Sequence, residues 1–258
     1  MQLVVNNANT VLGSKVLLGV QEVVGSLESE ALAQQRLARG ASFMQAHEQA
    51  AAIVLSQRVL DNAAGGYVDF FLPLLIFHAV QIAIVFILAP VVCEKKRLWP
   101  WPAGALLQRI LFWSLLTATL AWLALGLAAL LFGMQVYVSL KLALLIFLFA
   151  FTMTALAFAV GLWIQRPTFC ISATLFYIMP SILFSNAVWP RSSMDKLSLI
   201  LSYLMPIGYI GDVGRTLLLR GSAPLFMQSV VGLMLFSLLF GSLAWVKIRC
   251  SGGLRYAG

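Results

Sequence analysis

Few residues in this 258-residue chain could do chemistry, and none of them forms a recognised catalytic motif. No GxxxxGK[ST] phosphate-binding loop occurs, and the nearest approach, Gly13-Ser14-Lys15, lacks a glycine at the required upstream spacing. HExxH metal sites and GxSxG nucleophile turns are also absent from the sequence. We therefore predict that the chain is not an enzyme, binds no cofactor and holds no metal.

The cysteines and histidines give no stronger signal for a reactive site. Cys93, Cys170 and Cys250 lie at the ends of apolar stretches, without CxxC spacing or a neighbouring histidine cluster, which indicates neither a metal site nor a disulfide framework. His78 is the only titratable residue well inside an apolar stretch. A lone histidine there is more often a structural hydrogen-bond partner than a proton relay, so proton-driven transport is disfavoured.

The densest charge cluster covers residues 94–102, which we call the docking segment. It could simply set membrane orientation, with its tryptophans at the membrane interface. It could also be a docking surface for a partner on the cytoplasmic side, because its prolines make a stiff, sharply turned connection that can transmit a push. The residues that would dock the partner are Glu94, Lys95, Lys96, Arg97, Trp99 and Trp101.

A second unusual stretch, residues 189–221, is too polar to span a membrane and too apolar for a free loop. The pattern predicts a short helix that ends at Met205-Pro206 and a second helix over residues 207–219, broken by three glycines at 208, 211 and 214. We expect a helical hairpin that dips partway into the outer leaflet. Such irregular backbone is tolerated in a membrane only where protein covers it or where it lines a cavity.

The elements that position these residues are long apolar stretches. Hydrophobic residues make up 61% of the chain and charged residues only 10%, which is far from the composition of a soluble domain. A membrane-spanning helix needs about 20 mostly apolar residues. We predict an all-α, polytopic bundle of about five transmembrane helices, at about residues 70–93, 103–132, 140–164, 169–189 and 225–246.

Basic residues suggest how these spans are oriented. The formal net charge is +8, and the basic residues mostly flank the apolar stretches, as expected of membrane-flanking charges and not of a nucleic-acid surface. An odd number of spans places the two termini on opposite sides. The positive-inside rule favours the N-terminus outside and the C-terminus in the cytoplasm. Arg191, Lys196, Arg215 and Arg220 would then lie outside, against the rule.

The segment before the first span, residues 1–69, is polar and forms a separate, extracytoplasmic part in this prediction. Residues 11–39 have the spacing of an amphipathic helix, Gly40 is a plausible stop, and residues 41–59 are expected to form a second helix. An outside start without a signal peptide favours an upstream transmembrane helix that this chain lacks. The alternative is direct translocation of the tail.

Taken in their order along the chain, these sequence features resemble those of the membrane-spanning subunit of type-2 ABC exporters. The front of the chain is similar to a strand and turn of that family's extracytoplasmic domain at residues 3–9, followed by a polar lead into a span. The second half carries more of the resemblance, in Gln165-Arg166-Pro167, Met179-Pro180, Ser185-Asn186, Trp189-Pro190, Pro206-Ile207-Gly208-Tyr209 and the run from Arg215 to Gly221. Only Glu94 of the family's usual turn after this span is present, and the family's first span is absent.

The resemblance implies a subunit that forms the substrate pathway as a homo- or heterodimer in the bacterial inner membrane. A cytoplasmic ATPase would bind the docking segment, and the substrates would be drugs or other amphipathic compounds, with a periplasmic adaptor as a possible further partner. The hairpin would act as an outer gate through Trp189, Pro190, Pro206, Tyr209, Arg215 and Gly221. The alternative is a non-transporting scaffold or a truncated remnant of such a permease; an adjacent ATPase gene would favour transport.

Overall fold

The computed structural model describes residues 3–6, 19–20, 22–23, 30, 34, 37–40, 57–60, 67–96, 104–134, 136–185, 188 and 191–252. The chain divides into two compact units, Met1–Tyr67 and Val68–Gly258. The sequence placed this division between residues 69 and 70.

The N-terminal unit contains two short strands. Strand β1 (Leu3–Asn6) pairs in parallel with β2 (Gln57–Leu60), with Leu3 opposite Gln57. Of the strand and turn expected over residues 3–9, the strand is confirmed, and residues 7–9 lie outside the described residues. The described residues between 19 and 37 are helical, and Gly40 lies in a turn at φ 87°, as the predicted stop requires. The second helix predicted over residues 41–59 is wrong for its last three residues, which belong to β2; the others lie outside the described residues.

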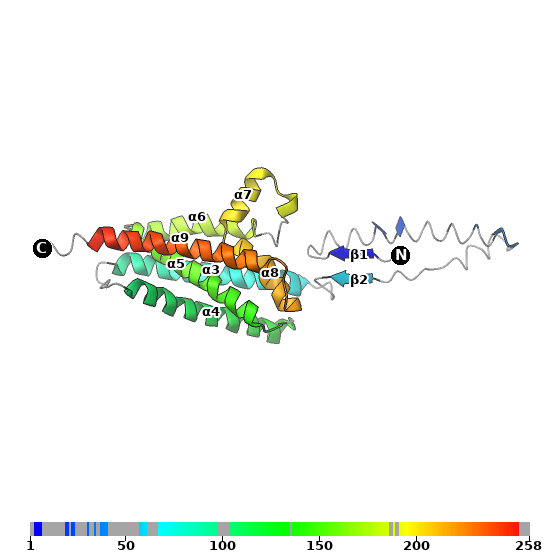
Figure 1. Cartoon of the computed structure of the whole chain (residues 1–258), viewed down its shortest axis with the longest axis horizontal. Coiled ribbons are helices and arrows are strands. Elements are labelled where there is room, and N and C mark those ends of the chain that lie inside the picture. The colour runs from blue at the N-terminus through cyan, green and yellow to red at the C-terminus, as the bar shows by residue number, and fades with distance from the viewer. Residues whose placement is uncertain are drawn as a thin grey trace. The chain divides into compact units, whose positions relative to one another are not determined.

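The second unit is a helical bundle (Figure 1). Among the described residues, four helices are long and apolar enough to cross a membrane: α3 (Tyr67–Lys95), α4 (Ala105–Phe132), α5 (Leu140–Trp163) and α9 (Phe226–Gly252). The count rises to five if the bent pair α7 (Lys196–Leu204) and α8 (Ile207–Arg220) is one span. The prediction of a polytopic helical bundle with about five spans is confirmed. Apolar residues run continuously along each long helix because every side of it faces protein or lipid.

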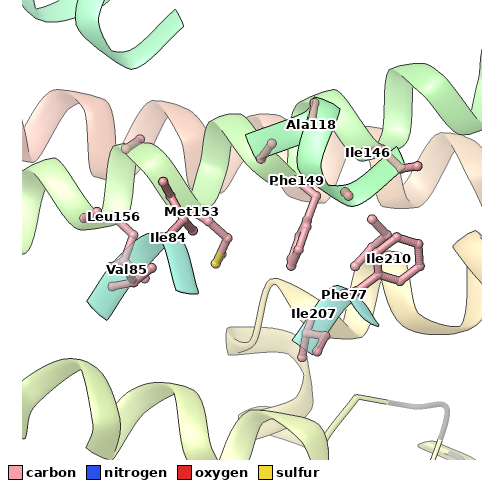
Figure 2. Packing of buried hydrophobic residues seen from close by; sticks show 14 of the residues in the cluster. Phe77, Ile84, Val85, Ala118, Ile146, Phe149, Met153, Leu156, Ile207 and Ile210 are labelled. Carbon is pink, nitrogen blue, oxygen red and sulfur yellow. The ribbon is translucent and has the colours of Figure 1, made fainter. Parts of the chain in front are cut away.

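Helix α5 is the most buried of the four long helices and contacts α4, α6, α8 and α9. Its Phe149 makes an edge-to-face contact with Phe77 of α3, with the ring centroids 6.3 Å apart. Figure 2 shows these two rings beside Ile207 and Ile210, from the start of α8. The core therefore joins the hairpin helix α8 directly to α3 and α5.

Polar side chains within the bundle also join helices. The Thr152 hydroxyl of α5 lies 3.1 Å from the Leu233 carbonyl oxygen and 2.8 Å from the Ser237 hydroxyl, both in α9. Small hydroxyl residues are common where membrane helices meet, because they allow a close approach and find partners across the interface. The α5–α9 contact is of this kind.

The apolar stretch predicted to span at residues 169–189 forms a shorter helix. Helix α6 (Pro167–Ile178) continues as the 3₁₀ turn η1 (Met179–Ile182), and the regular structure then ends. Pro180 is the physical reason, because it lacks the N–H of an α-helical turn and its ring favours a break. At about 1.5 Å per residue in α6 and about 2.0 Å in η1, the two segments cover about 26 Å, somewhat less than the roughly 30 Å of a bilayer's apolar core.

Gly161 provides a test of the α3–α5 packing. A Cβ at this position would lie 2.5 Å from the Ala89 carbonyl oxygen and 2.7 Å from Val92 Cβ, so Gly161→Ala must push the two helices apart. We expect a loss of about 1–3 kcal/mol of stability, measured by unfolding in detergent. Gly126→Ala is the matched control, since nothing lies within 4 Å of its Cβ, and should be neutral or gain about 0.5–1 kcal/mol. Equal effects of the two substitutions would contradict this packing.

Candidate functional site

The structure describes the first part of the docking segment, at the end of α3. Glu94 and Lys95 are exposed there, and Lys96 follows in a turn. Arg97, Trp99 and Trp101 lie outside the described residues. The two exposed charges are available to a partner.

Lys96 binds the end of another helix. Its Nζ lies 2.5 Å from the carbonyl oxygen of Ile164, 3.4 Å from that of Leu162 and 3.5 Å from that of Gly161. These groups belong to the last turn and C-cap of α5, where carbonyls have no partner within the helix and the helix dipole is negative. Lys96 therefore caps α5 from α3. The sequence grouped Lys96 with its neighbours as a docking residue; the structure gives it this internal contact.

Two further contacts hold the same helix ends together. The Cys93 thiol donates to the Ile164 carbonyl oxygen at 3.1 Å, and Gly161 brings the α5 backbone against Ala89 and Val92. Ala89, Val92 and Cys93 of α3, and Lys96 in the turn that follows it, have the three- and four-residue spacing of one helix face. One face at the end of α3 thus packs against the last turn of α5.

The hairpin, residues 191–221, has the two helices that its sequence predicts. Helices α7 and α8 meet at Met205 and Pro206 with a bend of 78° (Figure 1). The three glycines do not break α8, which is continuous. Asp195 caps α7 by accepting from the Ser198 backbone N–H, and hydrogen bonding to Ser198 lowers the pKa of its carboxyl group. Trp189 and Pro190 lie outside the described residues.

Arg191 ties α7 to α8. Its Cζ lies 4.4 Å from the centroid of the Tyr203 ring and 5.4 Å from that of the Tyr209 ring, and its Nε donates to the Ser202 hydroxyl at 2.9 Å. A Cβ at Gly208 would lie 3.0 Å from Arg191 Nη2, which explains the small residue there. The guanidinium plane therefore lies against aromatic rings from both helices.

Tyr209 connects this cluster to α9. Its hydroxyl donates to the Tyr203 carbonyl oxygen at 3.0 Å, and its ring packs edge-to-face on Phe236 with the centroids 5.9 Å apart. The ring occupies the space that a side chain at Gly232 would fill. Tyr209 thus anchors the hairpin on the bundle.

Arg215 and Gly221, also predicted as gate residues, have contacts within the protein. Arg215 is 3% exposed and forms an ion pair with Asp212 at 2.6 Å, one turn back on α8. A buried charge is costly without a partner, and the half-buried Asp212 supplies one. Gly221 ends α8 at φ 70°, a left-handed conformation that favours glycine, and its Cα lies against the Tyr137 ring. These two residues shape the hairpin from within.

A buried polar cluster joins α3 to η1. Gln81 Nε2 lies 2.7 Å from His78 Nδ1 and donates to the Ser181 hydroxyl at 2.9 Å. This arrangement agrees with the structural role expected of His78. Among the described residues, no group of three or more His, Cys, Asp or Glu side chains could hold a metal ion.

Sequence reasoning missed the residues that hold the hairpin. In the sequence, Arg191 is only a basic residue that breaks the positive-inside rule, Tyr203 is only part of a short predicted helix, and no motif marks Ser202 or Gly232. The spacing of Tyr203 and Tyr209 on either side of Pro206 was the available signal, since two rings that flank a helix break can meet. A glycine within an apolar helix, such as Gly232, was a weaker signal of close packing.

Comparison with models of protein families gives a match. A family model described as ABC-2 family transporter protein matches residues 2–246, nearly the whole chain. The match includes both the docking segment and the hairpin. No curated protein and no solved structure matches the chain.

The contacts of Arg191 with the rings of Tyr203 and Tyr209, here called the Arg191 cluster, lead to a prediction about the hairpin. Arg191→Lys keeps the charge but loses the planar group that lies on the two rings, so about 1 kcal/mol of contact energy should be lost. Backbone amides of α7 should then exchange hydrogen roughly fivefold faster. The measurement is hydrogen–deuterium exchange in detergent. Arg166→Lys, an exposed arginine at the start of α6, is the control and should leave α7 unchanged; an equal effect of both variants would count against the cluster.

Proposed function

The chain belongs to the ABC-2 family of transporter proteins, and we propose that it is the membrane-spanning subunit of an ATP-driven exporter whose ATPase is a separate polypeptide. The observation that carries the proposal is the family match over residues 2–246, on a bundle with four to five apolar spans. Members of this family are membrane transport components and are not themselves catalytic. The energy for export must then come from a partner that hydrolyses ATP.

In this proposal the ATPase binds the docking segment. Glu94 and Lys95 support this because both are exposed at the end of α3, where a partner can reach them. The sequence that follows, with its prolines and tryptophans, predicts a stiff connection to α4. Force from the ATPase enters the bundle at this point.

Two such subunits, identical or related, would enclose the pathway, with drugs or other amphipathic compounds as substrates and a periplasmic adaptor as a further partner. The low charge of the spans supports substrates that enter from the membrane. The hairpin would act as the gate at the outer end, where Tyr209 and Arg191 hold its two helices together. Closure of the ATPases would move the spans and open this gate.

The proposed membrane is the bacterial inner membrane, with the N-terminus outside and the C-terminus in the cytoplasm. Basic residues support this orientation because several gather at one end of the bundle. Lys96 binds the last turn of α5, and Lys247 of α9 lies 5.0 Å from the ring of Trp163 in the same turn. The positive-inside rule assigns this end to the cytoplasm.

The docking proposal is tested by reversing one exposed charge. Lys95→Glu should weaken ATPase retention about tenfold, equivalent to about 1.4 kcal/mol, because it places a like charge against a surface that suits a cation. The measurement is quantitative co-purification of the ATPase from native membranes. Lys196→Glu, an exposed lysine in the hairpin, is the matched control and should retain the ATPase fully. Unchanged retention by Lys95→Glu would reject the docking surface.

The orientation is tested by labelling single cysteines in the Cys250→Ser background, since Cys250 is exposed. Leu197 is 66% exposed in α7, and Leu197→Cys should react with a membrane-impermeant maleimide added to spheroplasts. Lys95→Cys should react only after the membrane is opened. The reverse pattern would overturn the proposed orientation.

A further inference from the structure

Lys96 differs from its two neighbours in the docking segment. Glu94 and Lys95 are exposed, whereas Lys96 is partly buried with its ammonium group on three carbonyl oxygens of α5. A lysine that bound an ATPase surface would have to leave these carbonyls and expose the uncapped end of α5. The two tasks therefore compete for one side chain.

The contact around Lys96 has the construction of a rigid joint. Gly161 lets the two backbones meet, the Cys93 thiol binds the same Ile164 carbonyl as Lys96, and the ammonium group covers the negative end of the α5 dipole. Three kinds of interaction thus act on one turn: steric fit, a thiol hydrogen bond and a charge–dipole contact. A joint of this kind resists both sliding and separation.

The helix held by this joint reaches the rest of the bundle. Helix α5 contacts α4, α8 and α9, and α8 forms half of the hairpin. Helix α3 also reaches the hairpin at its other end, where Phe77 packs against Gly214 of α8. A displacement of the joined ends of α3 and α5 would therefore reach α8 along two helices.

We propose that Lys96 is a positioning residue that locks the last turn of α5 to the end of α3, so that a displacement of the docking segment moves both helices as one body. This role rests on the proposed function, since the displacement comes from the ATPase. It divides the docking segment into two parts: Glu94 and Lys95 meet the partner, and Lys96 passes the motion to α5.

The test uses the full chain with its co-purified ATPase in nanodiscs, in the Cys250→Ser, Leu197→Cys background. Two quantities are measured: the amount of ATPase retained, and the ATP-dependent change in the maleimide reaction rate at position 197. The Lys96→Met variant should retain an amount of ATPase within twofold of that retained by the parent chain. Its ATP-dependent change in maleimide reaction rate should be at least fivefold smaller than that of the parent. Lys96→Arg, which keeps a cationic cap, should preserve most of the change. Lys95→Met is the matched neighbour: it should lower retention and leave the response of each retained complex intact.

Several results would overturn the role of Lys96. Loss of ATPase by Lys96→Met to the extent seen with Lys95→Met would make Lys96 a docking contact, and a full response at position 197 would show that the joint transmits nothing. A parent chain that retains no ATPase would instead reject the proposed function, and with it this role. Hydrogen exchange in the unsubstituted complex is a test that does not depend on a variant that folds. The backbone amides of residues 160–164 should stay protected from exchange when the ATPase binds. A fivefold rise in their exchange rate would show that ATPase binding breaks the contact of Lys96 with α5.

Discussion

The structure depends on one constraint: backbone polar groups need hydrogen-bond partners, and the protein must supply them wherever lipid or packed side chains keep water out. Long helices satisfy this constraint along their length but leave carbonyls free at their last turn. For α5 the partner comes from α3, as the Lys96 ammonium group and the Cys93 thiol. The end of the most buried helix is thus completed by the helix that leads into the docking segment, and this ties the two together.

Close packing holds the helices together, because lipid offers apolar side chains almost the same environment as protein does and burial between helices gains little by itself. Glycines mark the places where elements meet most closely: Gly161 against α3, Gly214 against Phe77, and Gly232 against Tyr209. Each contact joins segments that are far apart in the sequence. Together they connect α3 and α9 to the hairpin, so the hairpin belongs to the bundle and is not a loose loop.

Much of the bundle could be predicted from the sequence because long apolar runs have one stable form in a membrane. The hairpin helices could be predicted as well, since Pro206 interrupts an otherwise helical pattern. The side-chain contacts that join the helices could not be predicted from the sequence. Arg191 and Lys96 both read as surface charges, because their partners, the two tyrosine rings and the α5 carbonyls, come together only in three dimensions. The strand at Gln57–Leu60 also depends on tertiary context, because it forms by pairing with β1. The early end of the helix at Ile182 has a local cause in Pro180.

The central claim is that this chain conducts a substrate with energy from another polypeptide. Its most direct test is native mass spectrometry of the complex captured from membranes by this chain, which has a mass of 28.2 kDa. We expect an assembly with two permease subunits and two copies of an ATPase, whose ATP hydrolysis is lost when the ATPase is removed. A chain recovered alone or only with further copies of itself, under conditions that preserve other transporter complexes, would contradict the account.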